Sequence, residues 1–293
     1  MPTPQWRIPS IGLGNRFGFD ETARPPWLMV GHRKIKTMLL EFGRGKLVKS
    51  MTPHIADISK DGSDEGDNSF FMIEGKSPGQ GRIEVRNPKT RALEAALAVS
   101  VKNEMTYGVT FNFVQDYLNN KTTLQSGIAD ALKDSLNEIY RDQTNITFEL
   151  LQARHLPIDL ILNDAVIEER DIIDNKMKTG FARLPQEREW NKIFAANAND
   201  GFNIYFVPSD KKASENDTLV FTKGSNCIIE DGKQLPMYTL AHAIGRMLGC
   251  DFTTDRNRMN QLMFWDPGVE SKFFSRSDDF IPRDCANIMN PSP

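Results

Sequence analysis

The chain has 293 residues, 36 Lys and Arg, 39 Asp and Glu, and a net charge of -3. With 39% hydrophobic and 26% charged residues and no apolar run near about 18 residues, the composition excludes a disordered or membrane-spanning protein. The small acidic excess argues against nucleic acid as a partner, because phosphate-binding surfaces need a basic excess. The length predicts two domains.

Residues 1–26 are expected to form an irregular arm, because Gly12, Gly14 and Gly18 lie among turn-forming residues with no strand before them. Without a preceding strand, these glycines do not predict a phosphate-binding loop. The arm lacks both a basic start and an apolar stretch of about 7 to 15 residues, so no secretory signal peptide is expected. The localisation stays unknown, and export would need a route that uses no such peptide.

Residues 27–101 predict a small Ig-like β-sandwich, because short β-type segments alternate with turn signals. The charged stretches 44–49 and 61–67 are expected to be solvated loops. The region also resembles the Ig-like domains of bacterial surface and secreted proteins, which implies a spacer or adhesive module. The residues that carry this resemblance are Gly75, Ser77, Pro78, Gly79, Gly81, Ile83 and Val85.

Residues 102–293 predict a mixed α/β domain, which makes the whole chain α+β. Val109, Phe111 and Phe113 alternate with polar residues and predict a half-buried strand. A helix is expected to begin with Ser126 as its N-cap and to continue to about Tyr140. Its apolar stripe would be Ile128, Leu132, Leu136 and Ile139. Three more strands are expected at ITFELL, FNIYFV and NCIIED, with a helix near 187–195 before the second of these.

Residues 235–250 predict a buried helix that ends at Gly249, where a positive φ is favourable. In this setting the segment resembles the zinc-binding helix of metzincin metalloproteases, whose pattern is HExxHxxGxxH. The resemblance places His242 at the first zinc ligand and Gly249 at the turn.

The same resemblance shows what has been lost. Ala243 stands at the general base, Arg246 at the second His and Phe252 at the third His. Loss of two of three ligands should forfeit most of a zinc-binding energy of about 10 to 16 kcal/mol. Loss of the base alone should cost on the order of 10² to 10⁴ in rate.

Downstream, IPRDCANIMNP resembles the Met-turn of the same family, with Met289 beneath the metal site. The resemblance therefore spans residues 102–293 and implies a zincin fold without its catalytic residues. We expect a pseudoenzyme with no cofactor that binds a protein or peptide partner. The binding surface would lie between the helix around His242 and an edge strand at 227–231. The pairing of the two domain types would suit a bacterial exported effector or surface-associated protein.

Arg246 has two interpretations. It is either an ordinary solvated or salt-bridged surface residue, or a replacement for the positive charge of the metal. In the second case it would pair with Asp251 or Asp255.

Three alternatives remain open from the sequence. An active metal-dependent peptidase would use His242 with Asp251, Asp255 or Asp284, with His155 as a further candidate, and zinc would be its cofactor. A natural protease could instead have been inactivated by substitution at Ala243. In the third alternative the old cleft is filled, with Phe252 at the metal position. A nucleophilic Cys227 acting with His242 is disfavoured, because a buried thiol is inert.

Overall fold

The computed structural model describes residues 2–9, 18–21, 23–62, 64–116, 119–158, 187–208, 220–231 and 237–250. Predictions that concern Asp251, Phe252, Asp255, Asp284 and Met289 lie outside these residues. The described chain divides into two compact units. The first contains residues up to Met105 together with Ile139–Thr147, and the second contains Thr106–Glu138 and residues 148–250.

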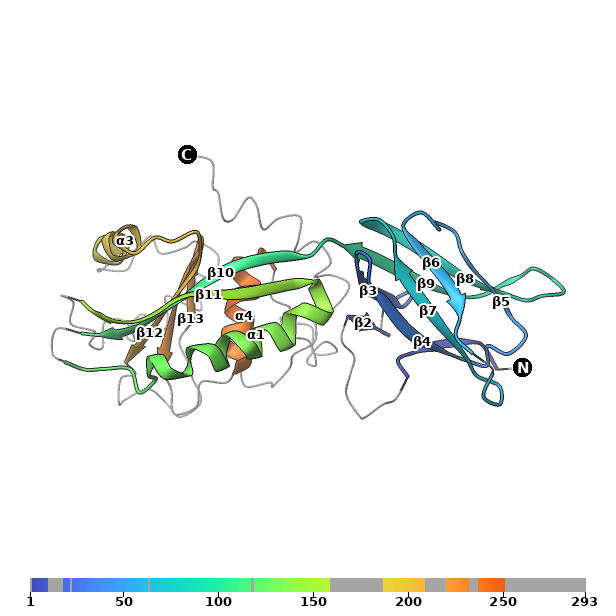
Figure 1. Cartoon of the computed structure of the whole chain (residues 1–293), viewed down its shortest axis with the longest axis horizontal. Coiled ribbons are helices and arrows are strands. Elements are labelled where there is room, and N and C mark those ends of the chain that lie inside the picture. The colour runs from blue at the N-terminus through green and yellow to red at the C-terminus, as the bar shows by residue number, and fades with distance from the viewer. Residues whose placement is uncertain are drawn as a thin grey trace. The chain divides into compact units, whose positions relative to one another are not determined.

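The first unit is a β-sandwich of two sheets (Figure 1). The strand order is β1-β4-β7-β6 in one sheet and β2-β3-β9-β8-β5 in the other. Neighbouring strands are antiparallel except for β3 and β9, which are parallel. The strands are β1 (Gln5–Arg7), β2 (Phe19–Asp20), β3 (Trp27–Gly31), β4 (Ile35–Glu41), β5 (Leu47–Ser50), β6 (Ala56–Lys60), β7 (Ser69–Gly75), β8 (Gly79–Arg86) and β9 (Leu93–Lys102).

The sandwich core forms because alternate residues of each strand face the opposite sheet. On β8, Ile83 and Val85, which carry part of the Ig-like resemblance, are fully buried. The predicted loop at 44–49 is wrong in its second half, because β5 begins at Leu47 and places Val48 against the core. Polar and apolar residues alternate there, but an alternation over only four residues is too short to distinguish a strand from a loop.

The turn that carries the Ig-like resemblance has a clear structural role. The N–H groups of Lys76 and Ser77 donate to the carbonyl oxygen of Ile55, at 2.7 and 3.2 Å. A side chain at Gly75 would meet the carbonyl oxygen of Gly31 at 2.6 Å, so the close approach of the two sheets requires glycine.

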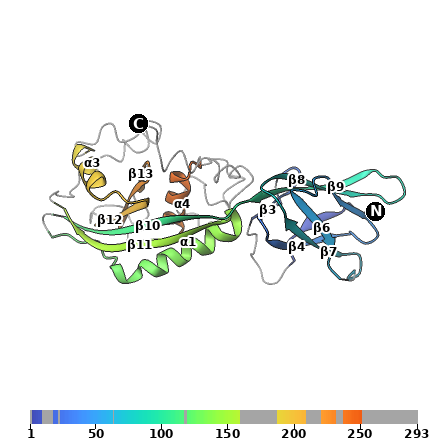
Figure 2. The same ribbon diagram turned by 45° about the horizontal axis from the view of Figure 1, so that its top comes forward.

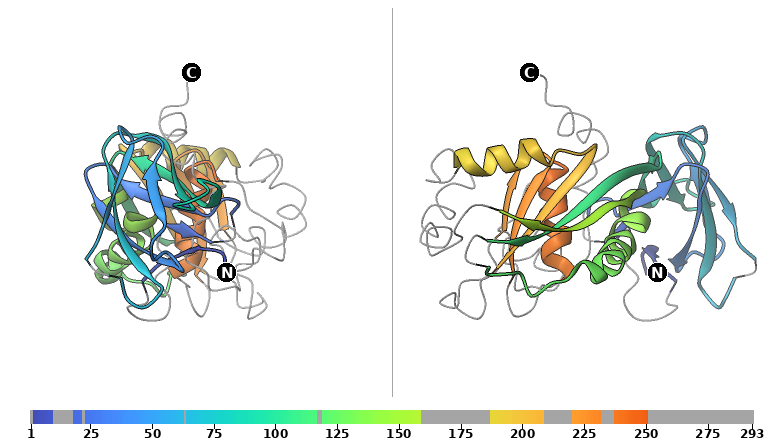
Figure 3. Two further views of the ribbon diagram at one scale, coloured as in Figure 1. Left: turned by 90° about the vertical axis from the view of Figure 1, so that its right-hand side faces the viewer. Right: turned by 60° about the vertical axis from the view of Figure 1, so that its left-hand side comes forward.

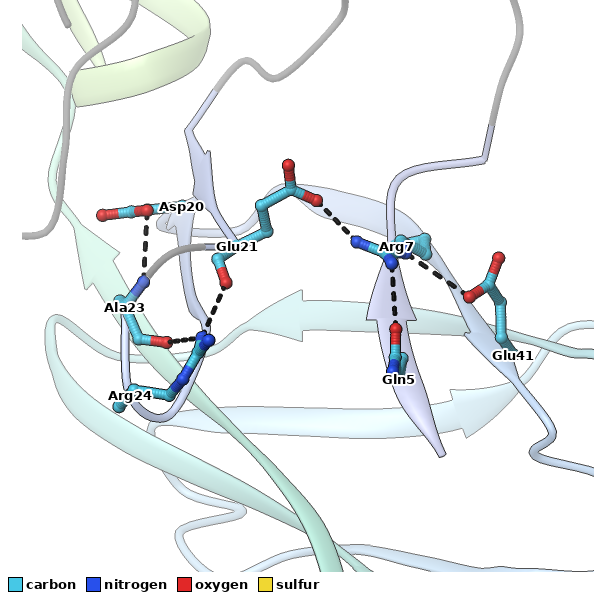
Figure 4. Close-up of polar contacts among 7 residues, drawn as sticks. All are labelled: Gln5, Arg7, Asp20, Glu21, Ala23, Arg24 and Glu41. Atoms are coloured by element: carbon cyan, nitrogen blue, oxygen red, sulfur yellow. Dashed lines mark hydrogen bonds and ion pairs between the residues drawn. The ribbon is translucent and has the colours of Figure 1, made fainter. Parts of the chain in front are cut away.

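The N-terminal arm is more ordered than the sequence predicted. Its residues Gln5–Arg7 form β1, an edge strand paired with β4, and Trp6 is buried in the sandwich core. Arg7 forms ion pairs with Glu21 at 2.6 Å and Glu41 at 3.4 Å (Figure 4). The expectation of an irregular arm is therefore wrong for these residues, because strand pairing with β4, the buried Trp6 and the ion pairs of Arg7 hold them on the sandwich.

The first unit also includes the end of the helix α1. Asn145 follows the helix with a φ of 58°, and its Nδ2 donates to the carbonyl oxygen of Lys102 at 2.9 Å. Lys36 Nζ donates to the carbonyl oxygen of Asp142 at 2.7 Å. Burial lowers the pKa of Lys36 to about 8, and the charge of Asp142 opposes this shift.

The second unit is built on one sheet of order β11-β10-β12-β14-β13 (Figure 2). β12 is parallel to both β10 and β14, whereas β13 is antiparallel to β14. The strands are β10 (Met105–Gln115), β11 (Ile146–Pro157), β12 (Gly201–Pro208), β13 (Val220–Lys223) and β14 (Asn226–Asp231). The helices are η1 (Ser126–Ile128), α1 (Ala129–Thr144), α3 (Glu187–Ala196) and α4 (Met237–Met247).

Helices cover both faces of this sheet. α3 lies on one side, with α1 and α4 on the other (Figures 1 and 3). On the α3 side, Trp190 and Phe194 pack against Tyr205 with ring centroids 6.0 and 5.2 Å apart. Within the described residues no helix is both long and apolar enough to cross a membrane.

The α+β fold class is confirmed, and three details of the second unit differ from the prediction. β10 is buried on both faces rather than half-buried, because α3 covers the face that carries Thr110 and Asn112. Ser126 does not cap α1, which starts at Ala129 after a 3-10 turn. β13 was not predicted at all.

Candidate functional site

The helix α4 forms and ends as its sequence dictates. Its apolar residues Leu240, Ile244 and Met247 recur at helical spacing and are buried. Gly249 has a φ of 93°, and its N–H donates to the carbonyl oxygen of Arg246 at 3.0 Å. The N–H of Cys250 donates to Gly245 at 2.9 Å, which completes a Schellman motif. The prediction that the helix stops at this glycine is confirmed.

His242 and Arg246 lie one helical turn apart and are half-buried, whereas Ala241, Ala243 and Ile244 are fully buried. These two residues therefore share the least buried side of α4. At the positions that the metzincin resemblance would assign to two zinc ligands and a general base, α4 holds an imidazole, a guanidinium and a methyl group. This donor set does not fit zinc, because a permanent cation four residues from the one remaining His repels a second cation.

No group of three or more His, Cys, Asp or Glu side chains suited to a metal occurs among the described residues. His155 is exposed on β11, whereas α4 contacts β13 and β14. β10 and β12 lie between β11 and β14, so these strands are about 14 Å apart. The structure does not bring His155 and His242 together.

The surface expected at 227–231 needs a correction. β14 is not an edge strand, because β13 pairs with it antiparallel and is the outermost of the strands that the structure describes on that side of the sheet. The two strands join through a two-residue turn, Gly224–Ser225, in which Gly224 has a φ of 56°. Glycine at the first position of such a turn is the usual hairpin signal. The edge beside α4 is therefore β13.

The hairpin register determines which backbone groups of β13 face outward. Lys223 is opposite Asn226 across the two-residue turn, and this closing pair exchanges hydrogen bonds. Because the bonding alternates, Thr222, opposite Cys227, directs its N–H and C=O away from β14. Thr222 thus offers a donor and an acceptor at the sheet edge.

Cys227 is unsuited to nucleophilic catalysis. Its side chain is fully buried on an interior strand, and burial raises the pKa of the thiol far above its usual range. Because the nucleophile is the thiolate, a thiol held neutral in an apolar site is inert.

One polar cluster of the second unit was missed by the sequence analysis. Arg154 Nε donates to Asn112 Oδ1 at 2.7 Å, and its Nη2 donates to Asn197 Oδ1 at 2.5 Å. The nearby Tyr205 has a buried hydroxyl, and burial raises the pKa of Tyr205 to about 12 while the charge of Arg154 opposes the shift. The cluster joins β10, β11 and the end of α3. Nothing in the local sequence distinguishes Asn112 from the other polar residues that alternate with Val109, Phe111 and Phe113.

Comparisons with known proteins add little beyond the fold. No family model and no curated protein matches the sequence. Metalloproteinase-II from Bacteroides fragilis has 10% identity and a TM-score of 0.38, over 89% of this chain and 84% of that one. A chaperone-substrate complex has 8% identity and a TM-score of 0.35, over 75% of this chain and 38% of that one.

Domains 4 and 5 of the S-layer protein SbsC are also similar to part of the chain. They have 18% identity and a TM-score of 0.22, over 25% of this chain and 46% of theirs. The chain thus covers less than half the length of this S-layer structure.

Proposed function

We propose that the protein is a catalytically degenerate metalloprotease-like protein that binds an extended peptide along β13, beside α4. The proposal keeps the metzincin resemblance of residues 102–293 and moves the binding edge from 227–231 to β13. The observation that carries it is the edge at Thr222, which pairs with no further strand among the described residues and lies next to the helix that bears His242 and Arg246. An extended peptide that joins a sheet edge gains backbone hydrogen bonds whatever its sequence.

The side chains that α4 carries at positions 243 and 246 support binding rather than hydrolysis. Arg246 lies where a metal ligand would be needed, and Ala243 has no group that could move a proton. A guanidinium presents up to five N–H donors and suits a carboxylate or a backbone carbonyl. We therefore propose that Arg246 supplies the positive charge that the metal would have supplied, and that it pairs with Asp251 or Asp255 within the chain.

The metal content is the first test. Protein purified without chelator or affinity metal should contain far less than one zinc per chain by mass spectrometry, because His242 alone does not hold zinc. Near-stoichiometric zinc would favour the alternative of an active peptidase with a variant ligand set. A peptide-cleavage assay on the same sample then separates that alternative from a structural zinc.

A restored motif tests the resemblance itself. The triple variant Ala243→Glu, Arg246→His and Phe252→His should gain zinc if the segment keeps a metzincin frame. The single variant Ala243→Glu should gain neither zinc nor activity, since two ligands are still missing. Activity of this single variant would instead indicate a natural protease inactivated at that position.

The binding edge is tested with β-casein, a disordered polypeptide, labelled for fluorescence anisotropy. Thr222→Pro removes the outward N–H without removing a bond to β14 and should weaken binding about tenfold or more. Thr222→Val keeps the N–H and should bind as the wild type does. Equal binding by the wild type and both variants would mean that the peptide does not bind at β13.

The cellular role is part of the same proposal. The Ig-like domain is proposed to act as a spacer, and the second domain as the module that binds protein or peptide. Such an arrangement would suit an exported bacterial effector or a surface-associated protein.

A further inference from the structure

The outer face of β5 and β8 in the first unit combines exposed basic and apolar side chains. Ile83 and Val85 point into the core, so Arg82, Glu84 and Arg86 point away from it. The register places Lys49 of β5 opposite Glu84. The basic face, as we call it, comprises Leu47, Lys49, Met51, Arg82, Arg86 and Leu93.

Ion pairs hold the charged side chains of this face in place. Arg82 Nε donates to Glu84 at 3.1 Å, and Arg86 Nη2 donates to it at 2.6 Å. The Glu84 side chain is 10% exposed, whereas those of Arg82 and Arg86 are 46% and 42% exposed. With Lys49 this gives three cations and one carboxylate on a chain whose net charge is -3.

Large apolar side chains surround these charges. Met51 is 50% exposed, Leu93 47% and Leu47 38%. Leu47 and Leu93 flank Arg86 across three strands, because each is opposite it in the register. Exposed apolar groups together with Arg and Met are typical of protein interfaces, in which Lys is less common. The face therefore favours an acidic protein surface with an apolar component.

Such a surface exists on the same unit, at the end of the β6–β7 hairpin. Glu65 and Asn68 exchange two backbone hydrogen bonds of 3.0 Å around a turn in which Gly66 has a φ of 61°. Glu65 and Asp67 are exposed on this turn.

An exposed aromatic residue accompanies these carboxylates. Phe42 has a φ of 55°, which is unusual for a bulky residue, and its N–H donates to Asn68 Oδ1 at 3.4 Å. The acidic tip, as we call it, comprises Phe42, Glu65 and Asp67. One cation also lies at this turn, because Arg44 Nη1 donates to the carbonyl oxygen of Gly66 at 3.4 Å. Two carboxylates and one guanidinium leave the tip with a net negative charge, opposite to that of the basic face, and Phe42 adds an apolar group.

We propose that the acidic tip of one copy docks on the basic face of a second copy, so that the protein self-associates through its first unit. The carboxylates of Glu65 and Asp67 would meet Lys49 and Arg82, and Phe42 would lie against the exposed leucines. If both contacts form at once, the pair is a two-fold symmetric dimer; otherwise the contact repeats as a chain.

Sedimentation velocity of the whole protein tests the proposal. The wild type should associate at about 0.01 M salt and dissociate toward monomer at about 1 M salt, where the Debye length falls from about 30 to about 3 Å. A wild type that stays monomeric at low salt over the full concentration range overturns the proposal, and the basic face would then serve a foreign partner.

Two variants identify the contact. The face variant is Lys49→Glu with Arg82→Gln, in which Gln keeps a donor beside Glu84. The tip variant is Glu65→Lys with Asp67→Lys. Each alone should associate at least about tenfold more weakly than the wild type. The control Lys121→Glu with Lys192→Gln makes the same charge change at exposed positions of the second unit and should behave as the wild type.

Recombining the variants gives the sharpest result. The face and tip variants, mixed at equal concentration, should associate with each other, and one protein that carries all four changes should regain self-association. If mixing restores nothing, the acidic tip is not the occupant of the basic face and the proposal fails. Melting followed by circular dichroism checks that each variant is folded.

Discussion

β8 and β12 are both interior strands, yet their sheets leave different surfaces open. On β8 the buried Ile83 and Val85 alternate with Arg82, Glu84 and Arg86, because at β5 and β8 only one face of the sheet meets a core. At β3 and β9 the other face is buried as well, around Trp27, Met29 and Ala98. β12 is buried from Gly201 to Val207, because helices cover both faces of its sheet. A one-sided sheet can bind through its face, whereas a sheet covered on both sides has only its edges and loops.

The difference explains why our two proposals use different parts of a sheet. In the first unit we place the contact on the outer face of β5 and β8. In the second unit we place it on the β13 edge. Three measurements test the comparison itself, from the largest expected effect to the smallest.

The largest effect should come from uncovering one face of the second sheet. Trp190→Ala removes a buried ring that contacts Phe194 and Tyr205, and should lower the free energy of unfolding by about 3 to 5 kcal/mol. Urea denaturation followed by circular dichroism measures the change. Lys192→Ala, at an exposed position of α3, should change it by less than about 0.5 kcal/mol. Equal effects would mean that α3 does not cover the sheet.

A smaller effect is expected on the open face of the first sheet. Glu84→Gln removes the charge shared by Arg82 and Arg86 and should cost about 1 to 3 kcal/mol, since the carboxylate is buried but its partners are half exposed. Arg82→Gln should cost less than about 1 kcal/mol. If Glu84→Gln is neutral in urea denaturation, the three residues do not hold the face in one arrangement.

The smallest effect concerns Lys36 on β4, in the other sheet of the sandwich, because its side chain is partly exposed and solvent screens its charge. Its pKa is lowered from 10.5 to about 8 by burial. Between these values the unfolded chain binds the proton and the folded chain does not, so the free energy of unfolding should rise with pH from about 8 to 10.5. Lys36→Met should lose this rise when both proteins are unfolded in urea across that pH range. Parallel profiles would contradict the shift.

Alternating and helical patterns predicted much of the fold. Short β-type segments between turns predicted the sandwich, and the apolar stripe with Gly249 predicted where α4 stops. The strand β13 was not predicted, because it has only four residues and follows a polar segment. Gly224 is nevertheless a hairpin signal. The omission of β13 also led to the wrong edge strand, since an interior strand and an edge strand have the same local sequence pattern.

The candidate site was predicted only in part. Spacing along one helix placed His242 and Arg246 on one side of α4, which depends on local geometry alone. The separation of His155 from that helix depends on strand order, which pairs residues far apart in the sequence and leaves no local signal. The same holds for Arg154, whose partners Asn112 and Asn197 are 42 and 43 residues away.

One side chain on α1 limits how the second unit can polymerise. Asn137 Oδ1 accepts the N–H of Phe148, and its Nδ2 donates to the carbonyl oxygen of the same residue at 3.0 Å. The amide thus occupies both backbone groups of the β11 edge at that point, as a neighbouring strand would. A sheet with two open edges can add strands without limit and grow into a fibre. With the backbone groups of Phe148 occupied in this way, an added strand cannot pair with β11 at that residue, which shortens the edge that β11 offers to another chain.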